Sequence, residues 1–215
     1  MNTNQDLPTL QFITHATEKQ NYVQSARIAL ECGFKWIQYR CKKVESTEDL
    51  LQQGLEIKQL CHLHQAIFTV NDYVELALEL KADGVHLGKS DRPIIEARSY
   101  LGNNYIIGGT ANTIEDIEHL YTQGANYIGL GPFRFTNTKE KLSPILGIEG
   151  YRNLTDLCRK KKINTPIYAI GGITAYDASE IKATGIYGLA LSSAILQSPN
   201  AKEEFQKIYQ YFTNN

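Results

Sequence analysis

Short runs of β-branched or aromatic residues alternate with longer segments of helical periodicity along the whole chain. The eight runs are residues 10–14, 34–40, 66–70, 84–87, 105–108, 127–130, 167–170 and 187–191. Such runs are typical of buried strands, and apolar residues spaced three or four apart between them are typical of amphipathic helices. About eight strand–helix units without a Pro/Gly/Ser-rich linker favour an α/β fold, a single (β/α)8 TIM barrel, over an open doubly wound sheet.

Several helix boundaries are marked by residues that cap helices. Three pairs have the spacing of a capping box: Ser46 with Asp49, Asn112 with Glu115, and Thr174 with Asp177. After the second pair, one helical face would carry Ile114, Ile117, Leu120 and Tyr121, and Gly124 stands where that helix would stop. The last segment repeats the apolar pattern with Phe205, Ile208, Tyr209 and Phe212.

The charge balance excludes several classes of protein. The 215 residues include 22 basic and 23 acidic ones, a formal net charge of −1, and 42% are hydrophobic. A near-neutral chain has no general attraction to nucleic acid or to an anionic membrane, and no apolar run approaches the ~20 residues of a membrane-spanning helix. We expect one domain over residues 1–215, with residues 1–8 as a flexible N-terminal segment, and small molecules as its partners.

The cysteines carry no disulfide or zinc pattern. Cys32, Cys41, Cys61 and Cys158 include no C-x-x-C pair, and residues 1–8 are polar, without the apolar core of a signal peptide. The sequence therefore predicts a reduced, cytoplasmic protein. Its oligomeric state stays open, and a homo-oligomer is compatible with the sequence.

In barrels of this class, chemistry lies where the strands end and the following loops begin. The second run ends with Gln38, Arg40 and Lys42, which the two-residue period of a strand places on one face. Two cations facing the mouth of a barrel need an anion, and phosphate or pyrophosphate is the natural partner. The alternative is a solvated strand end with surface cations.

Two aspartates follow neighbouring strands. Asp72 comes directly after the third run, and Asp91 comes four residues after the fourth. Mg²⁺ takes oxygen ligands, commonly one or two carboxylates together with substrate phosphates and water. The pair therefore predicts a Mg²⁺ site, whereas for either aspartate alone a helix N-cap is the commoner role.

Three later segments offer groups suited to phosphate. The loop over residues 129–139 is long and polar, and it carries Thr136, Thr138 and Lys139, although a plain surface loop is the alternative. Gly172 follows the seventh run, and Ser192 with Ser193 follows the eighth. Barrels frequently bind phosphate after these two strands, where backbone amides can approach the ligand.

The histidines and the large aromatic residues give no comparable signal. His15 and His86 have no partner nearby in the sequence that would orient them as bases, so His86 is predicted to be structural. Trp36 and the many tyrosines are interpreted as packing residues, because no basic stripe accompanies them.

Taken in order, these motifs resemble those of the thiamine phosphate synthase family, which includes the thiazole tautomerases as close relatives. The resemblance depends on residues 38–42, 70–72, 82–88 with Asp91, 129–139, 146–150 and 169–173. It implies a (β/α)8 transferase of thiamine biosynthesis. This enzyme joins hydroxymethylpyrimidine pyrophosphate to hydroxyethylthiazole phosphate, giving thiamine phosphate and pyrophosphate, with Mg²⁺ required.

The resemblance also implies roles for individual residues. The pyrimidine pyrophosphate would be held by Gln38, Arg40, Lys42, Asn71, Thr110 and Lys139. The metal would be held by Asp72 and Asp91. The thiazole phosphate would be held by Thr136, Thr138, the amide of Gly172, Ser192 and Ser193. Arg40, Lys42 and Lys139 would be catalytic, since they would stabilise the departing pyrophosphate.

The chain departs from the usual pattern of that family at several positions. Cys41 replaces an acidic residue, Lys89 and Ser90 replace a Gln–acid pair, and Thr110 and Asn112 stand where Ser and His are usual. Ser192 replaces an apolar residue. Two alternatives to the synthase therefore remain: a thiazole tautomerase, and a phosphate-ligand sensor without turnover.

Overall fold

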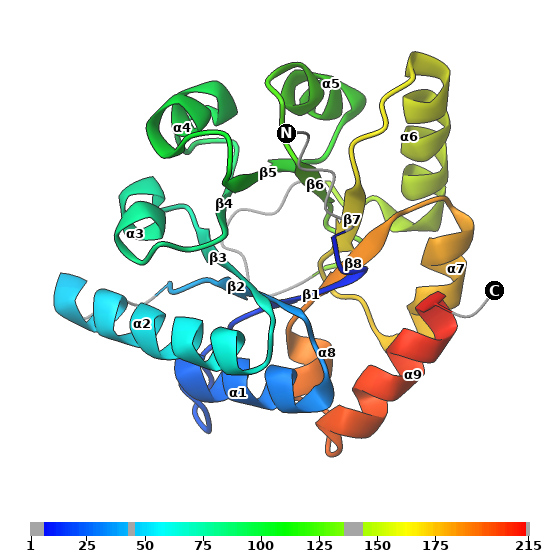
Figure 1. Ribbon diagram of the computed structural model, residues 1–215. Coiled ribbons are helices and arrows are strands. Elements are labelled where there is room, and N and C mark those ends of the chain that lie inside the picture. Colours follow the sequence, from blue (N-terminus) through cyan, green and yellow to red (C-terminus); the bar gives the residue numbers. More distant parts are fainter. Residues whose placement is uncertain (1–6, 43–45, 136–143, 214–215) are drawn as a thin grey trace.

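Eight parallel strands close into a barrel in the order β1 to β8, with β1 paired to β8. This architecture is that of a computed structural model, which describes residues 7–42, 46–135 and 144–213. The strands are β1 (Leu10–Ile13), β2 (Trp36–Tyr39), β3 (Ile67–Asn71), β4 (Gly84–Leu87), β5 (Ile106–Ala111), β6 (Tyr127–Leu130), β7 (Ile167–Ile170) and β8 (Gly188–Leu191). Figure 1 shows the helices as an outer ring around these strands. The predicted TIM barrel is confirmed.

The helices follow the strands in regular alternation. They are α1 (Tyr22–Cys32), α2 (Thr47–Leu63), α3 (Val74–Glu79), α4 (Ile94–Leu101), α5 (Ile114–Thr122), α6 (Gly147–Lys161), the 3-10 helix η1 (Ala175–Asp177), α7 (Ala178–Ala183), α8 (Ser193–Leu196) and α9 (Ala201–Thr213). Within the described part of the chain, no helix is long and apolar enough to cross a bilayer.

The predicted strand boundaries agree well, except at β5. This strand continues three residues beyond the predicted end at Gly108, because Thr110 and Ala111 pair in register with Gly129 and Leu130 of β6. Two successive glycines normally weaken a strand. Here they provide space, since a Cβ at Gly108 would collide with the Tyr127 ring and one at Gly109 with the Leu120 side chain.

The apolar residues form two layers, one inside the barrel and one between strands and helices. The interior contains Trp36, Tyr127 and Tyr168, whose rings meet edge to face at centroid distances of 4.7 to 5.7 Å. Such contacts are favourable beyond the area that they bury. The interpretation of these aromatic residues as packing residues is therefore confirmed.

Two of the three predicted helix caps are confirmed, and one is wrong. Ser46 accepts from the Asp49 amide at the start of α2, and Thr174 forms a capping box with Asp177 at η1. The cap of α5 is Thr113 with Asp116, one residue later than the predicted pair of Asn112 and Glu115. The Asn112 side chain is buried and bonds elsewhere, so it is not available to the helix.

The amphipathic faces of the helices are partly as expected. In α5, Ile117 and Leu120 are buried, but Tyr121 is exposed. In α9, Ile208 and Phe212 are buried and Tyr209 is exposed. The apolar stripe predicted for each helix is therefore narrower than its sequence pattern, because a tyrosine hydroxyl favours the solvent-facing border.

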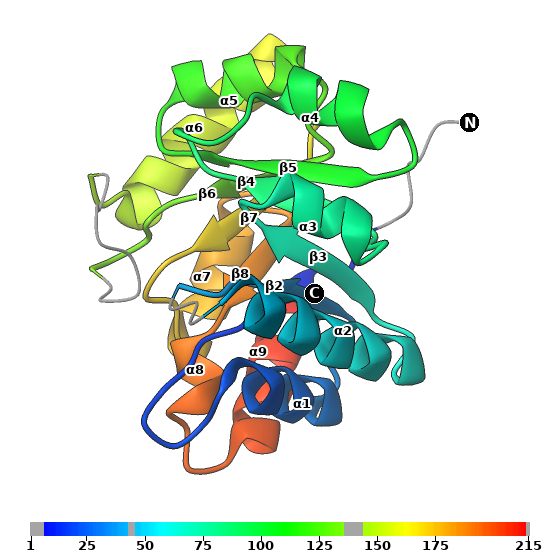
Figure 2. The same ribbon diagram turned by 90° about the vertical axis from the view of Figure 1, so that its left-hand side faces the viewer.

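All eight strands run in one direction, so the barrel has two chemically different ends. In the side view of Figure 2, β3 runs from right to left, which places the carboxyl ends of the strands on the left. The loops after the strands form what we call the mouth, and the loops before the strands form the opposite, amino end.

Candidate active site

Strand β2 delivers an amide and two cations to the mouth. The buried Gln38 side chain lies inside the barrel, where its Nε2 donates to Gln11 Oε1 at 3.4 Å. The Arg40 amide donates to Thr14 Oγ1 at 2.9 Å, and the Lys42 amide donates to the Tyr22 hydroxyl at 3.0 Å. These bonds fix the backbone of both cationic residues at the rim of the mouth.

His15, in the loop after β1, lies beside the same cations. Burial lowers the pKa of His15, and the positive charges of Arg40 and Lys42 lower it further. A cation repels a second positive charge nearby, so this pKa shift places His15, Arg40 and Lys42 in one electrostatic neighbourhood. Sequence reasoning missed this neighbour, because His15 is 25 residues from Arg40 and belongs to another strand–loop unit.

The predicted metal ligands Asp72 and Asp91 are both hydrogen-bonded to residues at the end of β4. The Asp72 amide donates to the His86 carbonyl at 2.8 Å, and Asp91 Oδ2 accepts from the Gly88 amide at 2.6 Å. His86 and Gly88 are two residues apart, at most about 7 Å along an extended backbone. The structure therefore brings the two aspartates to the same part of the mouth.

Neither aspartate caps a helix. The N-caps of α3 and α4 are Tyr73 and Pro93, and neither helix has a side-chain cap bond. Asp72 has φ +68°, a left-handed conformation that costs free energy for a residue other than glycine. The alternative interpretation of Asp72 and Asp91 as caps is wrong, and the strain at Asp72 is typical of a functional position.

The two carboxylates do not form a complete metal site by themselves. In the part of the chain that the structure describes, no three His, Cys, Asp or Glu side chains are grouped to hold a metal ion. Two carboxylates are a common protein contribution to a Mg²⁺ site whose remaining ligands are substrate phosphates and water.

Thr110 and Asn71 lie at the mouth on β5 and β3, the two strands that flank β4. Asn71 is the buried last residue of β3 and lies opposite His86 in the ladder. Thr110 Oγ1 is 3.0 Å from His86 Nε2, and His86 Nδ1 is 3.0 Å from the Tyr127 hydroxyl. His86 is thus buried and bonded on both sides, as a structural residue should be, but its partners are 24 and 41 residues away.

Gly172 closes the opposite side of the mouth. It has φ +68°, and its carbonyl accepts from Arg134 Nη1 at 2.8 Å. Arg134 also pairs with both carboxylate oxygens of Asp177, at 2.7 and 2.8 Å. Burial opposes ionisation of Asp177, but bonds from Arg134 and Thr174 outweigh it and lower the Asp177 pKa. This ion pair fixes the Gly172 backbone.

Ser192 and Ser193 follow β8 as predicted. Ser192 Oγ is buried and has no hydrogen-bond partner among the described residues. Leaving a buried hydroxyl unpaired costs free energy, so an orphan group of this kind calls for an explanation. A ligand oxygen at the mouth would provide the missing partner.

Three predicted residues, Thr136, Thr138 and Lys139, lie outside the described residues. The described residues on either side of this loop are held by Asn112, whose Nδ2 donates to the carbonyls of Gly131 and Pro144, both at 2.9 Å.

Two further departures from the family pattern have a structural role. Lys89 forms an ion pair with Asp116 at 2.5 Å, which ties the loop carrying Asp91 to α5. Cys41 is buried next to Tyr39. Neither change removes a predicted ligand.

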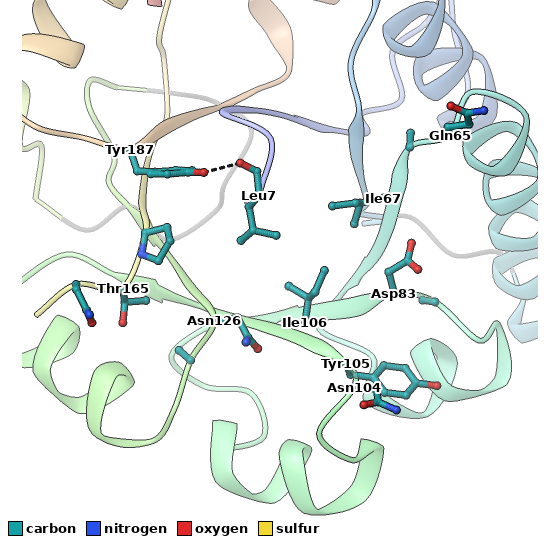
Figure 3. Close-up of a pocket in the computed structure, with 15 residues that line it drawn as sticks. Leu7, Gln65, Ile67, Asp83, Asn104, Tyr105, Ile106, Asn126, Thr165 and Tyr187 are labelled. Atoms are coloured by element: carbon teal, nitrogen blue, oxygen red, sulfur yellow. Dashed lines mark hydrogen bonds between the residues drawn. The ribbon is translucent and has the colours of Figure 1, made fainter. Parts of the chain in front are cut away.

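A cavity of about 920 Å³ lies at the amino end, away from the mouth. Figure 3 shows Ile67 and Ile106, the first residues of β3 and β5, and Tyr187, which bonds the Leu7 carbonyl at 2.7 Å. No Lys or Arg belongs to the described residues that line it, in contrast to the mouth, where Arg40 and Lys42 lie.

The sequence matches the thiamine monophosphate synthase family over residues 10–195, most of the chain. The chain belongs to the thiamine monophosphate synthase family. Among the members of this family, the chain is 52% identical to the thiamine-phosphate synthase of Bacteroides fragilis over 93% of its length and 98% of that relative. It is 49% identical to the thiamine-phosphate synthase of Flavobacterium johnsoniae, covering 93% of each. The family predicted from the sequence is confirmed.

Solved structures agree with this membership. The thiamine phosphate pyrophosphorylase of Pyrococcus furiosus superposes with a TM-score of 0.82 at 31% identity, covering 95% of each chain. The orotidine 5'-phosphate decarboxylase of Pyrococcus horikoshii superposes with a TM-score of 0.67 at 16% identity, covering 96% of this chain and all of the other. The second likeness concerns the barrel fold alone.

Proposed function

We propose that the chain is a thiamine-phosphate synthase, which joins hydroxymethylpyrimidine pyrophosphate to hydroxyethylthiazole phosphate and releases pyrophosphate. One observation carries the proposal: in a member of this family, Arg40 and Lys42 occupy the same mouth as Asp72 and Asp91, which are both hydrogen-bonded to the end of β4. Cations beside a carboxylate pair suit a pyrophosphate ester that binds together with a divalent ion.

The pyrimidine pyrophosphate would be bound by Gln38, Arg40, Lys42, Asn71, Thr110 and Lys139. Two neighbouring cations attract an anion, and Arg and Lys side chains form strong, charge-assisted hydrogen bonds to phosphate oxygens. The lowered pKa of His15 supports the same conclusion, since it reports a positive potential beside Arg40 and Lys42.

Asp72 and Asp91 would hold Mg²⁺. The fit is supported by their hard oxygen donors, by the hydrogen bonds that tie both to the end of β4, and by the absence of a helix-capping role for either. The ion would supply positive charge to the pyrophosphate oxygens.

The thiazole phosphate would be bound by Thr136, Thr138, the Gly172 amide, Ser192 and Ser193. The orphan Ser192 hydroxyl and the rigid Gly172 backbone support this side of the mouth as the second anion site.

No general base is needed for the reaction. The thiazole nitrogen already has a lone pair, and the difficult step is departure of pyrophosphate from the pyrimidine methylene carbon, which leaves a resonance-stabilised cation. Arg40, Lys42 and Lys139 would stabilise the charge that develops on the leaving group, an effect worth several kcal/mol in a preorganised site. The mouth would hold the nitrogen close to the new cation.

The remaining expectations agree with this proposal. All four cysteines are free, which supports a reduced cytoplasmic location. The barrel and its helices extend from β1 to α9, which supports one domain over residues 1–215. We also propose small-molecule partners without nucleic acid or membrane, and we leave a homo-oligomer open.

The test is a two-substrate assay for thiamine phosphate and pyrophosphate, with Mg²⁺ and with chelator. We expect stoichiometric release of both products with Mg²⁺ and loss of both in chelator. Tautomerisation of the thiazole that persists in chelator would instead identify a tautomerase. Tight product binding without repeated turnover would identify a sensor.

A further inference from the structure

We propose that His86 is a positioning residue: Tyr127 holds it as the Nε2–H tautomer, so that the Thr110 hydroxyl points its proton toward the pyrimidine pyrophosphate. The structural half of this inference is independent of the reaction. The kinetic half rests on the proposed function, since it assigns Thr110 to that substrate.

The network is buried below the mouth and spans four strands. The Tyr127 hydroxyl lies 3.0 Å from His86 Nδ1, and His86 Nε2 lies 3.0 Å from Thr110 Oγ1. On its other side the Tyr127 hydroxyl receives Gln11 Nε2 at 3.5 Å. Within this network, Thr110 is partly exposed and lies at the rim of the mouth. Gln11, His86 and Tyr127 are buried.

Glycines make room for the network. A Cβ at Gly108 would collide with the Tyr127 ring, and one at Gly129 would lie 3.1 Å from His86 Cε1. The ring centroids of His86 and Tyr127 are 5.4 Å apart. The Tyr127 and His86 rings therefore occupy the space left by the missing side chains of Gly108 and Gly129, and they have little freedom to rotate.

Donors already occupy the Tyr127 oxygen. Gln38 Nε2 donates to Gln11 Oε1, which leaves Gln11 Nε2 facing the Tyr127 hydroxyl. Burial raises the Tyr127 pKa, and hydrogen bonds with Gln11 and Gln38 partly offset this rise. A phenol has one proton to give, and His86 Nδ1 is the acceptor within reach.

The tautomer follows from this direction. If Nδ1 accepts, neutral His86 carries its proton on Nε2 and donates it to Thr110 Oγ1. The Thr110 proton is then available to an acceptor at the mouth. Thr110 thus presents a donor, which is the polarity that a pyrophosphate oxygen requires.

The first test reads the tautomer directly. Long-range ¹⁵N–¹H spectra of the histidine-labelled full chain distinguish Nε2–H from Nδ1–H, and the signal is assigned with His86→Gln. We expect Nε2–H. The Nδ1–H form would overturn the inference. In that form the side-chain amide oxygen and nitrogen of Gln11 and Gln38 exchange places, and the Thr110 hydroxyl donates to His86.

The second test separates positioning from packing. Tyr127→Phe keeps the ring and should lower kcat/KM for the pyrimidine pyrophosphate about tenfold, the effect of one misdirected bond to a charged group. In a Thr110→Val background the same change should have no further effect, because the hydroxyl that it orients is absent. An equal loss in both backgrounds would contradict the proposal.

Tyr168→Phe is the matched control. Tyr168 is also a buried tyrosine of the barrel interior, but its hydroxyl donates to the Pro8 carbonyl at 2.8 Å, toward the amino end. We expect unchanged kinetics and an unchanged His86 tautomer. If the chain makes no thiamine phosphate, the proposed function is wrong. The NMR spectrum still tests the His86 tautomer independently of that result.

Discussion

The two ends of the barrel differ in how their polar groups are satisfied. At the amino end, Asp83 Oδ2 accepts from the Phe68 amide at 2.7 Å, and Asn126 Oδ1 accepts from the Ile107 amide at 2.8 Å. At the mouth, Ser192 Oγ has no partner among the described residues, and Asp72 is held in a left-handed conformation. These two side chains at the amino end are therefore satisfied within the protein, whereas the mouth has a strained aspartate and a serine hydroxyl that is unpaired among the described residues.

The cavity and the predicted site lie at opposite ends of the barrel. The cavity of about 920 Å³ lies at the amino end, where its described lining contains no Lys or Arg. The mouth carries Arg40, Lys42, Asp72 and Asp91, which are the groups that an anionic, metal-dependent reaction needs. In TIM barrels this separation of stability and chemistry between the two ends is general.

Paired aspartate variants at the two ends should give the sharpest contrast. Asp72→Asn should lower kcat at least about 100-fold, because it removes a charge that would hold Mg²⁺. Asp83→Asn keeps an oxygen that can accept from the Phe68 amide and should leave kcat within about twofold. Steady-state kinetics over a Mg²⁺ series measure both, and comparable losses would contradict the division between the ends.

Gly172 offers a test of the second anion site. Gly172→Ala should raise KM for the thiazole phosphate about tenfold and cost about 1–2 kcal/mol of unfolding free energy, because of its φ of +68° and a collision with the Arg134 side chain. Gly124→Ala is the control, with φ +79° and open space around the added Cβ. For this control, urea unfolding should show a similar loss of unfolding free energy from the positive φ. Its KM for the thiazole phosphate should be unchanged.

Removal of the Ser192 hydroxyl should affect ligand binding without lowering stability. Ser192→Ala should raise KM for the thiazole phosphate about threefold and leave the unfolding free energy unchanged or higher, since no bond is lost on removing an unpaired group. Ser25→Ala should instead cost about 1 kcal/mol of stability without affecting KM, because Ser25 Oγ donates to the Tyr22 carbonyl at 2.8 Å. A stability loss in Ser192→Ala would show that its hydroxyl has a protein partner.

His15 should make the mouth sensitive to pH. Its pKa lies below the ordinary value of 6.5 because of burial and the neighbouring cations, so the unfolded chain binds this proton more tightly. The corresponding stability is fully present above about pH 6.5 and is lost as the pH falls from that value to the pKa of the folded state. Urea unfolding between about pH 5 and pH 7.5 should show this slope in the native chain and less of it in His15→Gln.

An anion at the mouth should act on the same histidine. Pyrophosphate would neutralise the field of Arg40 and Lys42, so it should raise the His15 pKa. An NMR titration of His15 with and without pyrophosphate measures the shift. An unchanged pKa with saturating pyrophosphate would place the anion elsewhere.

Much of the candidate site was predictable, because its residues are marked locally. Gln38, Arg40 and Lys42 alternate at the end of a strand, and the structure places that strand end at the mouth. Asp72 and Asp91 were ambiguous between capping and metal binding, since both roles favour aspartate just after a strand. The structure resolved the capping question because Tyr73 and Pro93 occupy the cap positions.

Other features could not be predicted from local patterns. Asn112 has the spacing of a cap, yet its amide bridges Gly131 and Pro144, 19 and 32 residues away. His86 has no partner nearby in the sequence, yet it joins Tyr127 to Thr110 across three strands. Such bonds depend on the register of neighbouring strands, which the sequence of one strand does not specify.

The sequence by itself determined the alternation of strands and helices, and with it the barrel, because burial of one face imposes a short-range period on apolar residues. It also determined which polar residue types follow each strand. The tertiary structure decided which of these groups meet and which of them are buried. Those properties arise only when β8 closes on β1, because closure fixes the register of residues that are distant in the chain.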